Sequence, residues 1–72
     1  MTASQFRAWL AAMHAAGHIR AENCGMDRDA GALLGVSPHT VVHMKREGVT
    51  GATAARTALA CRALLHRLEP YA

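Results

Sequence analysis

The stretch that most constrains the fold is Leu33–Pro38, because it joins a signal that ends one helix to a signal that begins another. Gly35 follows two leucines, and glycine most readily adopts the left-handed conformation that ends a helix. Ser37 is a favoured N-cap residue, and Pro38 suits the first helical position, where its missing N–H has no helical partner. The sequence therefore predicts two helices joined by a tight turn within residues 27–46.

Apolar and small residues on both sides of this turn fit the same arrangement. Val41 and Met44 are three residues apart and give the second helix of the pair one buried face. Val36 is expected to enter the core between the helices. Gly31, four residues before Gly35, is expected to let two helix backbones approach closely. Together these features predict a helix-turn-helix.

Residues 27–46 resemble the helix-turn-helix family of phage and bacterial repressors, in its lambda-repressor-like, XRE-type branch. The matching residues are Ala30, Gly31, Leu34, Gly35, Val36, Val41 and Met44. The chain departs from the family at Asp27, where glutamine is common, and at Gly31, where the family favours alanine. The resemblance implies that the protein is a DNA-binding regulator. It also implies that alanine would be tolerated at position 31. Its size and layout are also similar to those of small autorepressors encoded beside anti-CRISPR genes.

The composition indicates a single all-α domain that spans residues 1–72. Much of its apolar content is alanine, and Ala- and Leu-rich segments with few β-branched residues favour helices, of which we expect four or five. A chain of this length buries a limited core, so oligomerisation would be a natural source of extra stability. The net charge of +3 suits a nucleic-acid partner. Most basic residues lie from the motif onward: Arg28, Lys45, Arg46, Arg56, Arg62 and Arg67.

The sequence disfavours several classes of protein. No run approaches the roughly 20 apolar residues that a membrane-spanning helix needs. The N-terminal residues lack the basic and apolar regions of a signal peptide, so we expect a cytoplasmic location, and the resemblance implies that the cell is a prokaryote or a phage-infected host. Cys24 and Cys61 are too few for a disulfide scaffold and are expected to be reduced and structural. No phosphate-binding loop, catalytic triad or paired carboxylate site is visible, so we expect neither catalysis nor a cofactor.

The first helix is expected to follow Ser4 as its N-cap and to cover residues 5–16. Trp9 is expected at the edge of its buried stripe, which is formed by Phe6, Leu10 and Met13. Two outcomes stay open for residues 17–26. Either Gly17 ends the helix, or the segment continues it as a kinked extra turn.

Charged and capping residues set the expected limits of the next two helices. Asp27 is expected to cap the second helix, with Asp29 in its first turn, where a negative charge complements the helix dipole. The third helix is expected over Pro38–Glu47, and Gly48 is expected to stop it.

The last helix is expected to follow a loop at residues 49–53, with Thr50 or Thr53 as its N-cap. We expect it to run to about Leu68, because Pro70 cannot continue a helix and restricts the residue before it.

This last helix carries more apolar surface than a small core requires. Its cluster consists of Leu64, Leu65 and Leu68, extended upstream by Ala58, Leu59 and Cys61. Exposed apolar patches usually mark a partner surface, so we predict a homodimer whose interface comprises Leu64, Leu65, Leu68 and Tyr71. The rival interpretation is a monomer in which these leucines close over Phe6, Trp9 and Met13.

The third helix is the predicted recognition element, because burial of Val41 and Met44 leaves most of its other side chains outward. Arg46 can pair with guanine or phosphate, two histidines can donate to base acceptors, and Val42 can contact a thymine methyl group. The hydroxyls and the lysine suit phosphates. The predicted DNA-contact residues are Arg28, Ser37, His39, Thr40, Val42, His43, Lys45 and Arg46. The alternative is an ordinary exposed helix face.

The histidine spacing raises a second possibility. His14 and His18 are four residues apart, as are His39 and His43, so each pair could share one helical face and bind zinc. Neither pair carries the glutamate of a catalytic HExxH motif. A complete site would need further ligands from Cys24, Cys61 or His66. Surface histidines are the commoner explanation, so we expect no metal.

The sequence thus predicts a sequence-specific DNA-binding transcriptional repressor. It would act as a homodimer on an inverted-repeat operator in double-stranded DNA, with half-sites about one helical turn apart. The resemblance implies that it would regulate its own gene. The alternative is an anti-CRISPR-like inhibitor that binds a protein through its helix-turn-helix scaffold. An inhibitor that mimics nucleic acid should be acidic, whereas this chain is basic.

Overall fold

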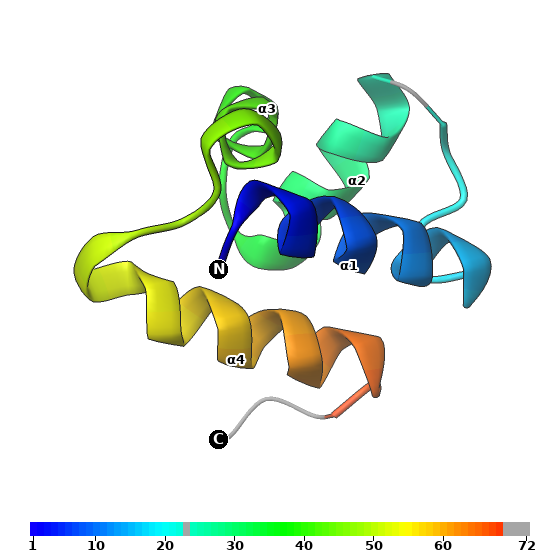
Figure 1. Ribbon diagram of the computed structural model, residues 1–72. Helices are drawn as coiled ribbons and strands as arrows, with labels where there is room; N and C mark the ends of the chain where they lie inside the picture. Colours follow the sequence, from blue (N-terminus) through cyan, green and yellow to red (C-terminus); the bar gives the residue numbers. More distant parts are fainter. Residues whose placement is uncertain (23, 69–72) are drawn as a thin grey trace.

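The computed structural model describes residues 1–22 and 24–68, and the predicted all-α fold is confirmed. These residues form four α-helices and one short 3-10 helix, with no strand among them: α1 (Ala3–Ala15), α2 (Cys24–Leu34), α3 (Pro38–Glu47), η1 (Gly51–Thr53) and α4 (Ala54–Leu65). In Figure 1, α1 lies between α4 below it and the α2–α3 pair above it. Both α1 and α2 pack against α3 and against α4.

The hydrophobic core draws on all four α-helices and on the segment after α1. Phe6, Leu10 and Met13 are buried as predicted, together with Ile19, Ala30, Val41, Met44 and Cys61. Trp9 was predicted at the edge of the core, but it is only 6% exposed. Its indole N–H donates to the carbonyl oxygen of Cys61 at 2.8 Å, so the buried polar atom has a partner and the ring ties α1 to α4.

The start of α1 corrects the prediction that Ser4 is its N-cap. Thr2 is the N-cap: its hydroxyl oxygen accepts from the Gln5 N–H at 3.1 Å, and the Gln5 side-chain oxygen accepts from the Thr2 N–H at 2.9 Å. This reciprocal pair is a capping box, for which threonine and a glutamine three residues later have the right spacing. Ser4 lacks a glutamate or glutamine at that distance.

The end of α1 decides between the two outcomes left open for the following segment. Gly17 has φ +82°, the left-handed conformation that ends a helix, and residues 18–22 are not helical. Ile19 is 1% exposed, and a ring nitrogen of His18 lies 3.1 Å from the carbonyl oxygen of Leu65. The segment is therefore held against α4 without a helix of its own.

The start of α2 corrects the predicted cap at Asp27. The helix begins at Cys24, so Asp27 lies inside its first turn and Asp29 lies beyond that turn. Asp27 is 7% exposed, and its Oδ1 accepts from the Lys45 ammonium at 2.8 Å. The carboxylate therefore joins two helices instead of capping one.

The turn between α2 and α3 follows the sequence signals closely. Gly35 has φ +75°, and the Ser37 hydroxyl oxygen accepts from the Thr40 N–H at 3.2 Å, which confirms the serine N-cap. Val41 and Met44 are buried as predicted. Val36 was expected in the core, but it is 36% exposed and borders a surface groove between α3 and α4.

The last helix differs from its prediction at both ends. Residues 51–53 form η1 where a loop was expected, and Thr53 occupies the N-cap position of α4 without a side-chain capping hydrogen bond. The helix ends at Leu65, before the predicted limit at Leu68. Pro70 lies outside the described residues. The early end leaves Leu68 outside the helix, so it cannot extend a helical stripe.

Gly31 touches the turn more closely than the resemblance implied. A Cβ atom at this position would lie 2.6 Å from the carbonyl oxygen of Val36, a backbone atom that cannot move without disturbing the turn. The close approach is therefore to the turn itself, and the expectation that alanine is tolerated here is wrong for this chain.

We predict that Gly31→Ala lowers the free energy of unfolding by about 1–3 kcal/mol, because the added methyl group overpacks the contact with Val36. Urea denaturation would measure the loss. Ala32→Ser at the exposed neighbouring position is the control and should change stability by about 0.5 kcal/mol or less. Equal stability of Gly31→Ala and the wild type would contradict this packing.

Cys61 generates a prediction about pH. Burial raises the pKa of its thiol from 9.0 to about 11. Because the folded pKa exceeds the unfolded one, folding favours the neutral thiol. The stabilisation is complete below pH 9 and is lost as the pH rises toward 11. Between these limits the wild type should lose up to about 3 kcal/mol more stability than Cys61→Ala, which lacks the thiol. If the free energies of unfolding of the two proteins change in parallel with pH, the prediction is wrong.

Candidate nucleic-acid interface

The outward face of α3 carries four side chains opposite its buried ones. With Val41 and Met44 inward, the 3.6-residue period places the opposite strip on the solvent side. All four residues of this strip are exposed: His39, Val42, His43 and Arg46. The strip presents hydrogen-bond donors, one apolar side chain and one permanent positive charge. Glu47 is exposed only at the C-terminal end of the helix.

The N-terminal end of α3 is fixed by its own cap. The Ser37 hydroxyl oxygen accepts from the Thr40 N–H, and the two side-chain hydroxyls lie 3.0 Å apart. Both residues are exposed, as predicted. The pair sets the direction of the first turn, from which any base contact in a major groove would be made.

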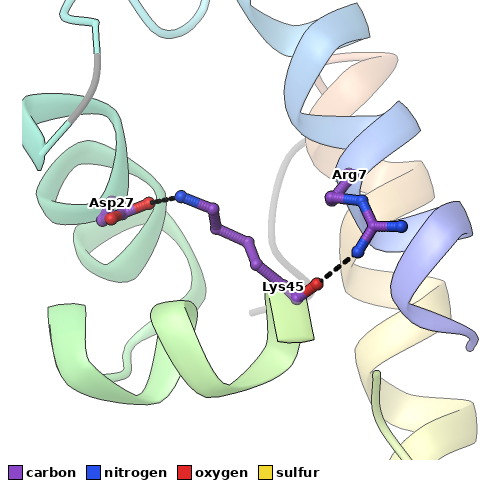
Figure 2. Close-up of polar contacts among 3 residues, drawn as sticks. All are labelled: Arg7, Asp27 and Lys45. Atoms are coloured by element: carbon purple, nitrogen blue, oxygen red, sulfur yellow. Dashed lines mark hydrogen bonds and ion pairs between the residues drawn. The ribbon is translucent and has the colours of Figure 1, made fainter. Parts of the chain in front are cut away.

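Lys45 is used differently from its prediction as a phosphate contact. Its Nζ donates to Oδ1 of Asp27 at 2.8 Å, with the two side chains 33% and 10% exposed (Figure 2). A carboxylate this buried needs a charged partner or several hydrogen bonds, and the lysine supplies the charge. The ammonium is therefore directed at α2, so we assign Lys45 to the helix–helix contact.

A second polar contact reaches the same residue from α1. The Arg7 guanidinium donates through Nη1 to the carbonyl oxygen of Lys45 at 2.6 Å, as Figure 2 shows. This carbonyl lies in the last turn of α3, where the helix offers no N–H partner. A cation there also interacts favourably with the negative end of the helix dipole. The side chain and the backbone of Lys45 thus connect α3 to α2 and to α1. Neither contact was predictable from local sequence patterns, because the partners lie 38 and 18 residues away in the chain.

Arg28 is exposed on α2, directly after the buried Asp27. It therefore belongs to the outer surface of the same helix pair. Seven of the eight predicted DNA-contact residues are exposed. The exception is Lys45, which is half-buried and forms an ion pair with Asp27.

A groove between α3 and the start of α4 was not predicted from the sequence. We call it the α3–α4 groove; it has a volume of about 540 Å³ and is bounded by Thr40, His43, Met44, Val49, Thr53 and Arg56 among others. Val49 is held in place because its N–H donates to the carbonyl oxygen of Met1 at 2.8 Å. Thr50 and Thr53, the two candidate N-caps of the last helix, both border this groove.

The histidines of the two predicted pairs do not form a shared metal site among the described residues. A ring nitrogen of His14 lies 3.8 Å from a Glu22 carboxylate oxygen, and His18 approaches the Leu65 carbonyl group, while His39 and His43 are exposed. Within residues 1–22 and 24–68, no three His, Cys, Asp or Glu side chains gather as metal ligands. The side chain of Cys24, one of the suggested ligands, lies outside the described part.

The predicted dimer residues fall into two groups. Leu64 and Leu65 are half-buried and pack against the core, as the monomer interpretation proposed for them. Leu68 is 64% exposed and lies with Leu64 and Leu33 along a second, smaller groove of about 380 Å³. Leu59 is 67% exposed but does not border that groove. Tyr71 lies outside the described residues.

A search of protein-family models, curated proteins and solved structures found no match to this chain. In the part of the chain that the structure describes, none of the helices has the length and apolar character needed to cross a membrane.

Proposed function

We propose that this protein is a sequence-specific repressor that binds double-stranded DNA through α3. The observation that carries the proposal is the exposed strip of α3 within a helix-turn-helix whose recognition helix is held at both ends. Ser37 caps its start, and Asp27 and Arg7 hold its last turn through Lys45. A rigid helix can present side chains to base edges in a fixed register.

Each exposed side chain of the strip has a chemical role in this proposal. Arg46 can donate two hydrogen bonds to the O6 and N7 atoms of a guanine, the commonest specific contact. His39 and His43 can donate to base acceptors, and Val42 can contact a thymine methyl group. The exposed positions of Arg28, Ser37 and Thr40 support contacts to phosphates, which set register. Lys45 is left out of the contact set because its ammonium pairs with Asp27.

An inverted-repeat operator requires two such helices at a fixed separation. We propose a homodimer whose half-sites lie about one helical turn apart and whose interface is centred on the exposed Leu68. Leu64 and Leu33, which border the same smaller groove, would extend this interface. Binding would occlude a promoter, the most economical mechanism for a small domain, and we propose the promoter of its own gene in the cytoplasm.

We predict that Arg46→Ala weakens binding to DNA taken from upstream of the protein's own gene by about 1–3 kcal/mol and relaxes specificity at one base position. Gel-shift titration with footprinting would measure both effects. Arg62→Ala removes the same charge from an exposed position on α4 and should weaken binding much less. Equal losses in the two variants would mean that Arg46 acts only through net charge, and unchanged affinity would exclude it as a contact.

We predict that Leu68→Glu produces a folded monomer with much weaker operator binding, because a carboxylate at the centre of the proposed interface would have to be desolvated. Light scattering at micromolar concentration would give the mass of the wild type and the variant. Leu59→Glu adds the same charge at an equally exposed leucine away from the groove and should stay dimeric. A monomeric wild type would end the dimer proposal.

A further inference from the structure

The α3–α4 groove is lined by apolar side chains in its interior and by mostly polar side chains at its exposed edge. Its buried and half-buried apolar side chains are Leu34, Met44, Val49 and Ala60. Its volume of about 540 Å³ falls within the range of about 300–1,000 Å³ that is usual for small-molecule sites. Apolar walls with a few polar groups at the edge are the usual composition of such sites.

The exposed edge of the groove is polar and carries only positive charge. Arg56, in the first turn of α4, supplies a permanent charge, and His43 on α3 faces the groove from the other wall. Thr40, Thr50 and Thr53 add hydroxyl groups at exposed positions. No aspartate or glutamate borders the groove. An anionic group at this edge would thus meet a guanidinium and hydroxyl donors with no carboxylate to repel it.

From this arrangement we infer that the α3–α4 groove binds a small organic anion, a carboxylate or sulfonate attached to an aromatic or aliphatic body. The apolar body would lie against Met44, Val49 and Ala60, and the anionic head would pair with Arg56. Inorganic phosphate fits the edge but gains nothing from the apolar walls. A neutral hydrocarbon would pack against the apolar walls but would leave Arg56 without an anionic partner.

Such a ligand would occupy the space beside the recognition helix. Thr40 and His43 border the groove and also belong to the proposed DNA-contact set. Ligand and operator would then compete for these two residues. This consequence rests on the proposed function, whereas ligand binding itself does not.

The test is a titration of the purified protein with anilinonaphthalene sulfonate, an anion with an aromatic body, followed by amide NMR spectra. Phenylnaphthylamine, which has the same rings without the sulfonate, and inorganic phosphate are the comparison probes. We expect saturable shifts at Met44, Val49 and residues 50–57. Both comparison probes should cause much smaller shifts at equal concentration.

Arg56→Gln should weaken sulfonate binding about tenfold, since it removes a charge-assisted hydrogen bond. Arg62→Gln, an exposed arginine of the same helix that does not border the groove, should leave the affinity unchanged. Shifts centred on Leu33 and Leu68, equal affinity for phosphate, or equal losses in the two arginine variants would overturn the inference. Because no DNA is present, its failure is distinct from a failure of operator binding.

Discussion

The orientation of α3 depends on one lysine. Lys45 pairs with the nearly buried carboxylate of Asp27 on α2, and its carbonyl oxygen accepts from Arg7 on α1. Removing the ammonium would leave a buried charge without compensation, which costs far more than the loss of an exposed ion pair. Thus α3 is held by the Lys45 contacts at one end and by the Ser37 cap at the other.

This arrangement separates the residues that hold α3 from those that it presents. The inward side chains Val41 and Met44 bury its apolar face, and Lys45 on the flank provides the polar contact. The opposite strip is exposed, so its composition is free to suit a partner. Substitutions at Arg46 should therefore change binding with little effect on stability, whereas substitutions at Lys45 should do the reverse.

What could be predicted from the sequence was local. Gly35, Ser37 and Pro38 determine the turn through conformational and capping preferences that act over a few residues, and all three behaved as expected. The contacts of Asp27 and Trp9 depend on partners 18 and 52 residues away, which no local pattern specifies. The end of α4 was misplaced because Pro70 marks where a helix must stop, not where packing ceases to support it. The outward strip was predictable from the helical period, but the α3–α4 groove depends on how residues 48–53 place α4 beside α3, which no local pattern specifies.

The α3–α4 groove and the exposed strip of α3 share His43, and under the proposed function this has a consequence for regulation. A ligand that binds only when DNA is absent must lower operator affinity by the factor by which DNA lowers ligand affinity, since coupling between two sites is reciprocal. Such coupling would need no separate sensor, because His43 borders the groove and belongs to the proposed DNA-contact set. The rigid attachment of α3 through Lys45 favours direct competition over a shift of the helix, because movement of α3 would break the pair with Asp27.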